Sequence, residues 1–177
     1  MSTPAAEPDL ADRFAAELRR ADGVPHPGAD PQELALSLAP PGAVVAVDDD
    51  PELEDLAAAT AAAGRVVLRP ADPTFRDRLP TATLGVTRCR AAIADTGTLL
   101  LVFDRSHPRG TSLLPRVHLA VVHAADLVPG LGDGLARIPS PPPSAVTLVT
   151  GPSRSADIEQ LLTLGVHGPA QVHAALP

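Results

Sequence analysis

The sequence predicts an α/β domain with a mostly parallel central sheet and helices on both faces. Apolar runs such as Ala43–Val47 are continuous rather than alternating, which is typical of strands buried on both faces of a parallel sheet. Helical patterns separate these runs, as in a strand–helix–strand unit. A chain of 177 residues, 45% of them hydrophobic, is long enough to bury one sizeable core.

The N-terminal part predicts one amphipathic helix followed by a linker. Leu10, Phe14 and Leu18 recur every four residues, which indicates a helix over 9–20. Residues 21–31 are rich in Pro and Gly, so we expect a linker there. The expected organisation is therefore a helical lead-in at residues 1–22 and one α/β domain at residues 32–177.

A strand–helix–strand unit is expected next. The strand at Ala43–Val47 ends at three aspartates, and Pro51 then stands at a first helical position. The Leu- and Ala-rich helix that follows ends at Gly64, a residue type suited to the position after a helix. Val66–Leu68 is the second strand of the unit.

The remaining elements are less regular. We expect a short element over 88–93, a turn at 95–97, strands at 98–103, 117–122, 145–150 and 171–176, and helices over 127–135 and 153–164. Residues 104–116 form a polar loop with three arginines, which is either a lid or a docking surface.

Charge and composition exclude several classes of partner. All 14 basic residues are Arg, so any bound anion must be held by Arg, by backbone N–H groups or by a helix N-terminus. The net charge of −7 argues against a nucleic-acid partner. The first residues lack a secretory signal and the apolar runs are too short to span a bilayer, so we expect a cytoplasmic protein without membrane insertion.

Metal and cofactor sites are not expected. Cys89 is the only cysteine, and one thiol cannot form a disulfide, a Cys-rich zinc site or a four-thiolate cluster. His118 and His123 lie five apart on one strand run and so point to opposite faces. We therefore expect no metal and no cofactor.

The sharpest candidate site is the segment TLVTGPSRSADIEQ. A strand leads into Gly151, and Ser153 or Ser155 can cap the expected helix, with Asp157 in its first turn. The helix N-terminus and Arg154 would together hold an anion. The competing interpretation is that the serines and Asp157 only cap the helix. A hydrolase nucleophile elbow is disfavoured, because its last glycine is Ser155 here.

Two further segments carry polar groups in unusual backbone settings. In the turn before the strand at 98–103, Asp95 could act as a base or hydrogen-bond acceptor, with Thr96, Gly97 and Thr98 beside it. The alternative is a turn in which Asp95 bonds its own backbone. His167 lies next to glycines and either contacts a ligand or has a structural role.

Three segments in this order resemble the lactate-utilisation domain (LUD) family: GVTRCRAAIADTGTLLLV, SLLPRVHLAVVHAADLVPGL and VTLVTGPSRSADIEQLLTLGVHGPAQVHAAL. The resemblance covers about residues 80–177, with Asp95 where the family more commonly has Glu. It implies a fold similar to the sugar-phosphate isomerase and CoA-transferase superfamily. It also implies a role in bacterial oxidation of L-lactate to pyruvate beside separate iron–sulfur proteins, and it brings no established reaction for this component.

Three hypotheses remain open from the sequence. The first is a non-redox component of a lactate-oxidising system, which acts with iron–sulfur partners and binds a small anion between Asp95–Thr98 and Gly151–Asp157. The second is a stand-alone enzyme on a CoA, sugar-phosphate or nucleotide substrate, with Asp95 as base or nucleophile and Arg154 as anion clamp. The third is a scaffold or regulator without a ligand.

Overall fold

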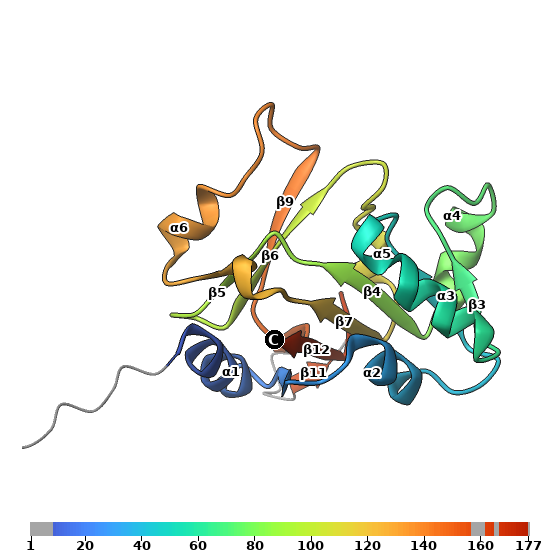
Figure 1. Cartoon of the computed structure of the whole chain (residues 1–177), viewed down its shortest axis with the longest axis horizontal. Coiled ribbons are helices and arrows are strands. Elements are labelled where there is room, and N and C mark those ends of the chain that lie inside the picture. The colour runs from blue at the N-terminus through green and yellow to red at the C-terminus, as the bar shows by residue number, and fades with distance from the viewer. Residues whose placement is uncertain (1–8, 157–161, 165–166, 177) are drawn as a thin grey trace, which may run out of the picture.

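The computed structural model describes residues 9–156, 162–164 and 167–176. Its centre is a six-stranded sheet in the order β1-β12-β7-β4-β2-β3, in which every neighbouring pair is parallel (Figure 1). Its strands are β1 (Val24–Pro27), β2 (Val44–Val47), β3 (Val66–Leu68), β4 (Leu84–Arg88), β7 (Val117–Val121) and β12 (Gln171–Leu176). The parallel sheet predicted from continuous apolar runs is confirmed.

Helices lie on both faces of this sheet. They are α1 (Leu10–Arg20), α2 (Pro31–Leu38), α3 (Glu54–Ala62), α4 (Phe75–Arg78) and α5 (Gly110–Leu113), with 3-10 turns at Pro51–Leu53, Leu79–Thr81 and Ala124–Asp126. Helix α6 (Leu131–Leu135) lies apart from this sheet, against residues 91–93 and 127–128. The side chains of α2 and α3 pack in one apolar cluster with β2, β4 and β7, while those of α1 and α4 pack in separate clusters on the opposite face.

Local sequence explains where the helices next to β2 begin. The Asp30 carboxylate accepts a hydrogen bond of 2.9 Å from the backbone of Gln32, and Asp50 accepts one of 2.9 Å from Glu52. A proline follows each of these acidic caps, and its fixed φ suits the first helical position. The capped start of the 3-10 turn Pro51–Leu53, which leads into α3, thus lies directly after β2, at the carboxyl edge of the sheet.

A second, four-stranded sheet covers part of the face that carries α1. Its order is β8-β5-β6-β9, and its strands are β5 (Ala91–Ile93), β6 (Thr98–Phe103), β8 (Leu127–Val128) and β9 (Ala145–Val149). Phe14 and Leu18 of α1 are fully buried between the two sheets, against residues of β6, β7 and β12. Burial of these side chains fixes α1 to the domain through the hydrophobic effect.

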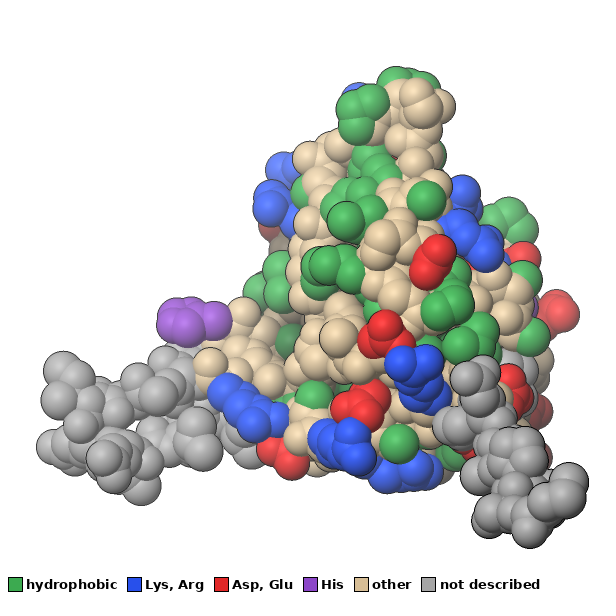
Figure 2. Space-filling view, turned by 90° about the vertical axis from the view of Figure 1, so that its left-hand side faces the viewer, with side chains coloured by type: hydrophobic (Ala, Val, Ile, Leu, Met, Phe, Trp, Pro, Cys, Tyr) green, Lys and Arg blue, Asp and Glu red, His purple; other side chains and the backbone are tan. Residues whose placement is uncertain are grey.

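Apolar side chains reach the surface on the side of α6 and β9. Leu131, Leu135 and Leu148 are each more than 40% exposed. Figure 2 shows this side, where apolar side chains spread over the upper part and charged side chains gather below. No helix among the described residues is long and apolar enough to cross a membrane.

Three local predictions are wrong. The expected linker contains β1, which pairs with β12; its prolines fit because it is an edge strand. The helix expected from Leu127 starts only at Leu131, since Leu127–Val128 pair with β5 as β8. The helix expected after Gly151 is replaced by β10 (Arg154–Ala156), which pairs with β11 (Leu162–Leu164); residues 157–161 lie outside the described part of the chain.

Candidate functional site

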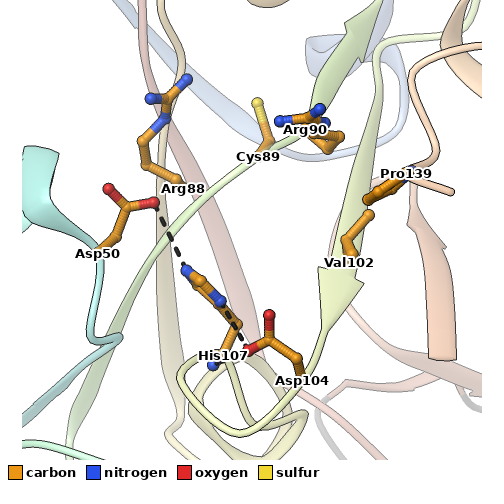
Figure 3. A pocket seen from close by; sticks show the side chains of 8 residues that line it. All are labelled: Asp50, Arg88, Cys89, Arg90, Val102, Asp104, His107 and Pro139. Atoms are coloured by element: carbon orange, nitrogen blue, oxygen red, sulfur yellow. Dashed lines mark hydrogen bonds and ion pairs between the residues drawn. The ribbon is translucent and has the colours of Figure 1, made fainter. Parts of the chain in front are cut away.

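The candidate site lies between the carboxyl ends of β2 and β4. The chain leaves β2 toward the face of α3 and leaves β4 toward the face of β5, so the two following loops diverge. A crevice at such a switch point is where open α/β sheets bind ligands. Here it is an open pocket of about 200 Å³, drawn in Figure 3, between Asp50 after β2 and Arg88–Arg90 at the end of β4.

The loop after β6 forms the third wall of this pocket and presents His107. The imidazole Nδ1 lies 2.9 Å from the Asp104 carboxylate, and Nε2 lies 3.5 Å from Asp50 (Figure 3). Backbone N–H groups of Ser106 and His107 also donate to Asp104, and the Asp49 N–H donates to the Ser106 carbonyl at 2.9 Å. The loop is therefore closed on itself and fixed to the end of β2.

The surroundings of His107 favour its protonated form. Burial alone would lower the pKa of His107, but the hydrogen bond to Asp104 and the charges of Asp48, Asp104 and Asp50 outweigh burial and raise the pKa. A carboxylate on Nδ1 also fixes the ring orientation, as in base–orienter pairs of hydrolytic enzymes. His107 can thus donate a hydrogen bond, or release a proton, from Nε2 into the pocket.

Asp48 is a buried acid close to this wall. Its side chain is 2% exposed, and Oδ1 has no hydrogen-bond partner among the described residues. Burial raises the pKa of Asp48 from 3.8 to about 7. The carboxyl therefore changes charge near neutral pH, and its charge acts on His107.

The two arginines at the end of β4 differ in what they can bind. Arg88 forms ion pairs with Glu52 and, at 2.6 Å, with Asp126, so its charge is matched by acids from the neighbouring loops. The Arg90 Nε donates to the carbonyl of Arg137 at 3.0 Å, and within the described ranges its guanidinium has no acidic partner. Arg90 is thus the cationic group of the pocket that is open to a ligand.

Cys89, between the two arginines, is not a nucleophile in this state. It is 2% exposed, and burial raises the pKa of its thiol. Among the described residues, no three His, Cys, Asp or Glu side chains are placed so that they could hold a metal ion. Arg90 and His107 give the site cationic hydrogen-bond donors, one of them a proton-carrying imidazole, and such donors suit a small carboxylate or other oxyanion.

The predicted turn Asp95–Thr98 lies beside α1 and does not line this pocket. Thr96 and Thr98 hydroxyls are 2.7 Å apart, and Thr98 lies 2.6 Å from the Thr150 hydroxyl. Asp95 forms an ion pair with Arg13 of α1. Gly97 has φ +61°, and a Cβ there would lie 2.2 Å from the Leu18 backbone nitrogen, so glycine permits the close approach of α1.

The second predicted segment contacts the end of the same helix. A Cβ on Gly151 would lie 2.0 Å from the Ala21 carbonyl oxygen. Arg154 donates to this carbonyl at 2.5 Å and forms an ion pair of 2.8 Å with Asp22. The structure thus brings 95–98 and 150–154 together, with α1 against both.

The other predicted residues are more scattered. The Ser153 N–H donates to the Pro169 carbonyl at 2.9 Å, and His167 is exposed. The Ser155 side chain and Asp157 lie outside the described part of the chain. None of the predicted ligand residues that the structure describes lines the pocket between β2 and β4.

Sequence reasoning missed the residues that do line the pocket. Asp50, Arg88, Arg90 and His107 were not predicted as ligand residues. Their position in the sequence could have indicated them, because these polar residues follow apolar strands, and ligands bind beyond the carboxyl ends of strands in open α/β sheets. Only the strand order shows that these ends are neighbours.

Comparison with known proteins gives consistent matches. A model of the LUD domain family matches residues 28–176. Lactate utilization protein C of Bacillus licheniformis is 38% identical over 100 residues, which are 53% of this chain and 42% of that protein. Lactate utilization protein C of Bacillus subtilis is 35% identical over 96 residues, 51% of this chain and 40% of that protein. The match therefore spans less than half the length of these curated relatives.

A solved structure shares the fold. The crystal structure of a DUF162 family protein from Deinococcus radiodurans superimposes with a TM-score of 0.65, over 94% of this chain and 95% of that one. At 21% sequence identity, this similarity shows a shared fold and nothing more.

Proposed function

The chain belongs to the LUD domain family, and from this membership we propose that it serves lactate utilisation by binding a small carboxylate in the pocket between β2 and β4. The observation that carries the proposal is that one pocket of about 200 Å³ is lined by both Arg90 and His107. The Arg90 guanidinium has no acidic partner among the described residues, and the His107 imidazole is bound by the Asp104 carboxylate. The name of the curated relatives, lactate utilization protein C, supports lactate as the carboxylate, and the oxidation implied by the family resemblance adds pyruvate as its product.

The two pocket groups match the two ends of such a molecule. A guanidinium binds a carboxylate through charge-assisted hydrogen bonds, which are about twice as strong as neutral ones. A protonated His107 donates from Nε2 to the hydroxyl oxygen of lactate or the keto oxygen of pyruvate. Asp104 holds this imidazole through Nδ1, and the charges of Asp50 and Asp104 favour the protonated form; the ligand oxygen takes the place of the 3.5 Å contact between Nε2 and Asp50.

Electron transfer is assigned to other proteins. Oxidation of lactate to pyruvate releases two electrons, and Cys89, the only cysteine, is buried and cannot ligate a cluster alone. We assign this step to separate iron–sulfur proteins that act with this chain in the cytoplasm, as the family resemblance implies. The proposal concerns the matched part of the family protein, because the match spans less than half of the curated relatives.

Calorimetric titration with L-lactate and pyruvate tests the binding proposal. Arg90→Gln should weaken binding by tenfold or more, since a hydrogen bond to a charged group contributes about 1.5–3 kcal/mol. Arg116→Gln, a change of an exposed arginine that does not line the pocket, is the matched control and should leave binding unchanged. Lactamide, which lacks the carboxylate, should not bind.

The pH dependence tests the role of His107. Lactate affinity should fall as pH rises through the raised pKa of His107, because the imidazole then loses its proton. His107→Asn in an Asp48→Asn background should remove this dependence, because Asp48 also changes charge near neutral pH. Equal lactate affinity in wild type and Arg90→Gln, or no binding of either acid at millimolar concentration, would contradict the proposal.

A further inference from the structure

A second pocket adjoins the first across the loop after β6. It has a volume of about 610 Å³ and lies between the segment after β3, from Pro70 to Arg76, and the loop Asp104–Pro108. Asp104 lines both pockets, so one loop forms a wall of each. Apart from Asp104, the two pockets have different linings, and the function proposed above places no ligand in the second pocket.

The walls of this second pocket combine rigid apolar surface with two arginines. Pro70, Pro73 and Pro108 contribute rings with no rotatable side chain, and Phe75 lies among them. Fixed apolar walls of this kind accept a flat or compact apolar group at little cost in conformational entropy. The pocket can therefore hold the body of an organic molecule as well as an ion.

Arg76 and Arg105 supply the charge. Arg76 comes from α4 and Arg105 from the loop after β6, so the two guanidinium groups belong to different walls. Within residues 9–156, 162–164 and 167–176, neither forms an ion pair or a side-chain hydrogen bond. Two uncommitted guanidinium groups in one pocket match the several oxygen atoms of a phosphate.

The carboxylates of this pocket are held in turns of their own segments. Asp72 Oδ1 accepts hydrogen bonds of 2.7 Å and 2.8 Å from the backbone and hydroxyl of Thr74. Asp104 Oδ1 accepts hydrogen bonds from its own loop. Hydrogen bonds within these turns lower the pKa of both acids, against the opposing effect of burial, so both are charged acceptors. Such acceptors suit ligand hydroxyl groups.

We propose that the second pocket binds a hydroxyl-bearing organic phosphate, with the phosphate between Arg76 and Arg105 and the body of the ligand against the proline walls. Hydroxyl groups of the ligand donate to the carboxylates of Asp72 and Asp104. Asp104 also orients His107, so a ligand bound to Asp104 in the second pocket changes the surroundings of a residue that lines the first pocket. The inference does not rest on lactate as the ligand of the first pocket.

Titration of the full chain with adenosine 5′-phosphate tests this proposal, with adenosine as the matched ligand that lacks the phosphate. Binding of adenosine 5′-phosphate should be at least tenfold tighter than that of adenosine. Arg76→Gln and Arg105→Gln should each weaken it about tenfold. Arg109→Gln, an exposed change on the same loop outside both pockets, should leave it unchanged.

The variants should fold normally, because Arg76 and Arg105 are exposed, and circular dichroism checks this. Adenosine binding as tightly as its phosphate would overturn the proposal. Equal affinity of adenosine 5′-phosphate for wild type and the Arg76→Gln/Arg105→Gln double variant would do so as well. The Arg90→Gln variant separates the two proposals, because it should lose lactate binding and keep binding of adenosine 5′-phosphate.

Discussion

Replacing Asp48 by Asn removes a buried carboxyl group whose ionisation lowers the stability of the folded state. The folded-state pKa of Asp48 is raised from 3.8 to about 7, and each unit corresponds to about 1.4 kcal/mol. Ionised Asp48 therefore destabilises the fold by about 4 kcal/mol above pH 7. Below about pH 4 the carboxyl is protonated in both folded and unfolded chains, and this cost vanishes.

The sign of the pH dependence follows from proton binding. Between pH 4 and 7 the folded chain holds a proton on Asp48 that the unfolded chain releases, so stability falls as pH rises through this window. Asn carries no charge at any of these pH values and has nearly the same shape as Asp. Any effect of the amide itself on the free energy of unfolding is therefore the same at low and at high pH. The stability of Asp48→Asn relative to wild type should therefore increase by about 3 kcal/mol between pH 4.5 and pH 8.5.

Urea unfolding followed by circular dichroism at these two pH values measures the difference. Asp77→Asn, a change of an exposed aspartate on α4, is the control and should show less than about 0.5 kcal/mol of change. A relative stability of Asp48→Asn that is the same at both pH values would refute the argument that burial raises this pKa. It would also remove Asp48 as a proton-carrying neighbour of His107.

Two further predictions concern the packing of α1 and the buried histidine of β7. Gly97→Ala should destabilise the fold by at least about 2 kcal/mol, because the new Cβ would meet the backbone of Leu18 at a residue whose φ is positive. Gly132→Ala is the control: the space around Gly132 is open, so this change should alter stability little. Equal shifts of the melting temperature in the two variants would contradict the prediction. Burial lowers the pKa of His118 to about 4, so its contribution to stability is complete above pH 6.5 and is lost as pH falls through 4. The stability advantage of wild type over His118→Asn should narrow by about 3 kcal/mol between pH 7 and pH 4, as urea unfolding would measure, and an advantage that stays constant would show that His118 is not kept neutral by burial.

The contacts of α1 give the predicted ligand segments a role in packing. Gly97 and Gly151 each leave room for backbone of this helix or of the residue after it. Asp95 pairs with Arg13, and Arg154 with Asp22. Of the polar residues picked out in the sequence, Asp95 therefore binds helix α1, and Arg154 binds the two residues that follow it.

The sequence by itself determined the fold class and those elements that have a clear local pattern, whereas helix α2 and the central strand β4 were not predicted. Continuous apolar runs at β2, β3 and β7 indicate strands buried on both faces, and such strands occur in parallel sheets. Acidic and proline caps and the period of apolar residues locate α1 and α3, because these signals depend on residues only a few positions apart. The LUD resemblance also follows from local motifs.

Only the tertiary structure decided which loops meet at the edge of the sheet. Strand β4 lies beside β2, not β3, so Arg90 faces Asp50 across the pocket, and the loop after β6 brings His107 between them. Residues 24–27 become a strand only because β12 pairs with them, and His26 contacts His173 across 147 positions of sequence. The order of the strands and these pairings depend on the burial of apolar surface between segments that are distant in the sequence. Local sequence patterns therefore do not predict them.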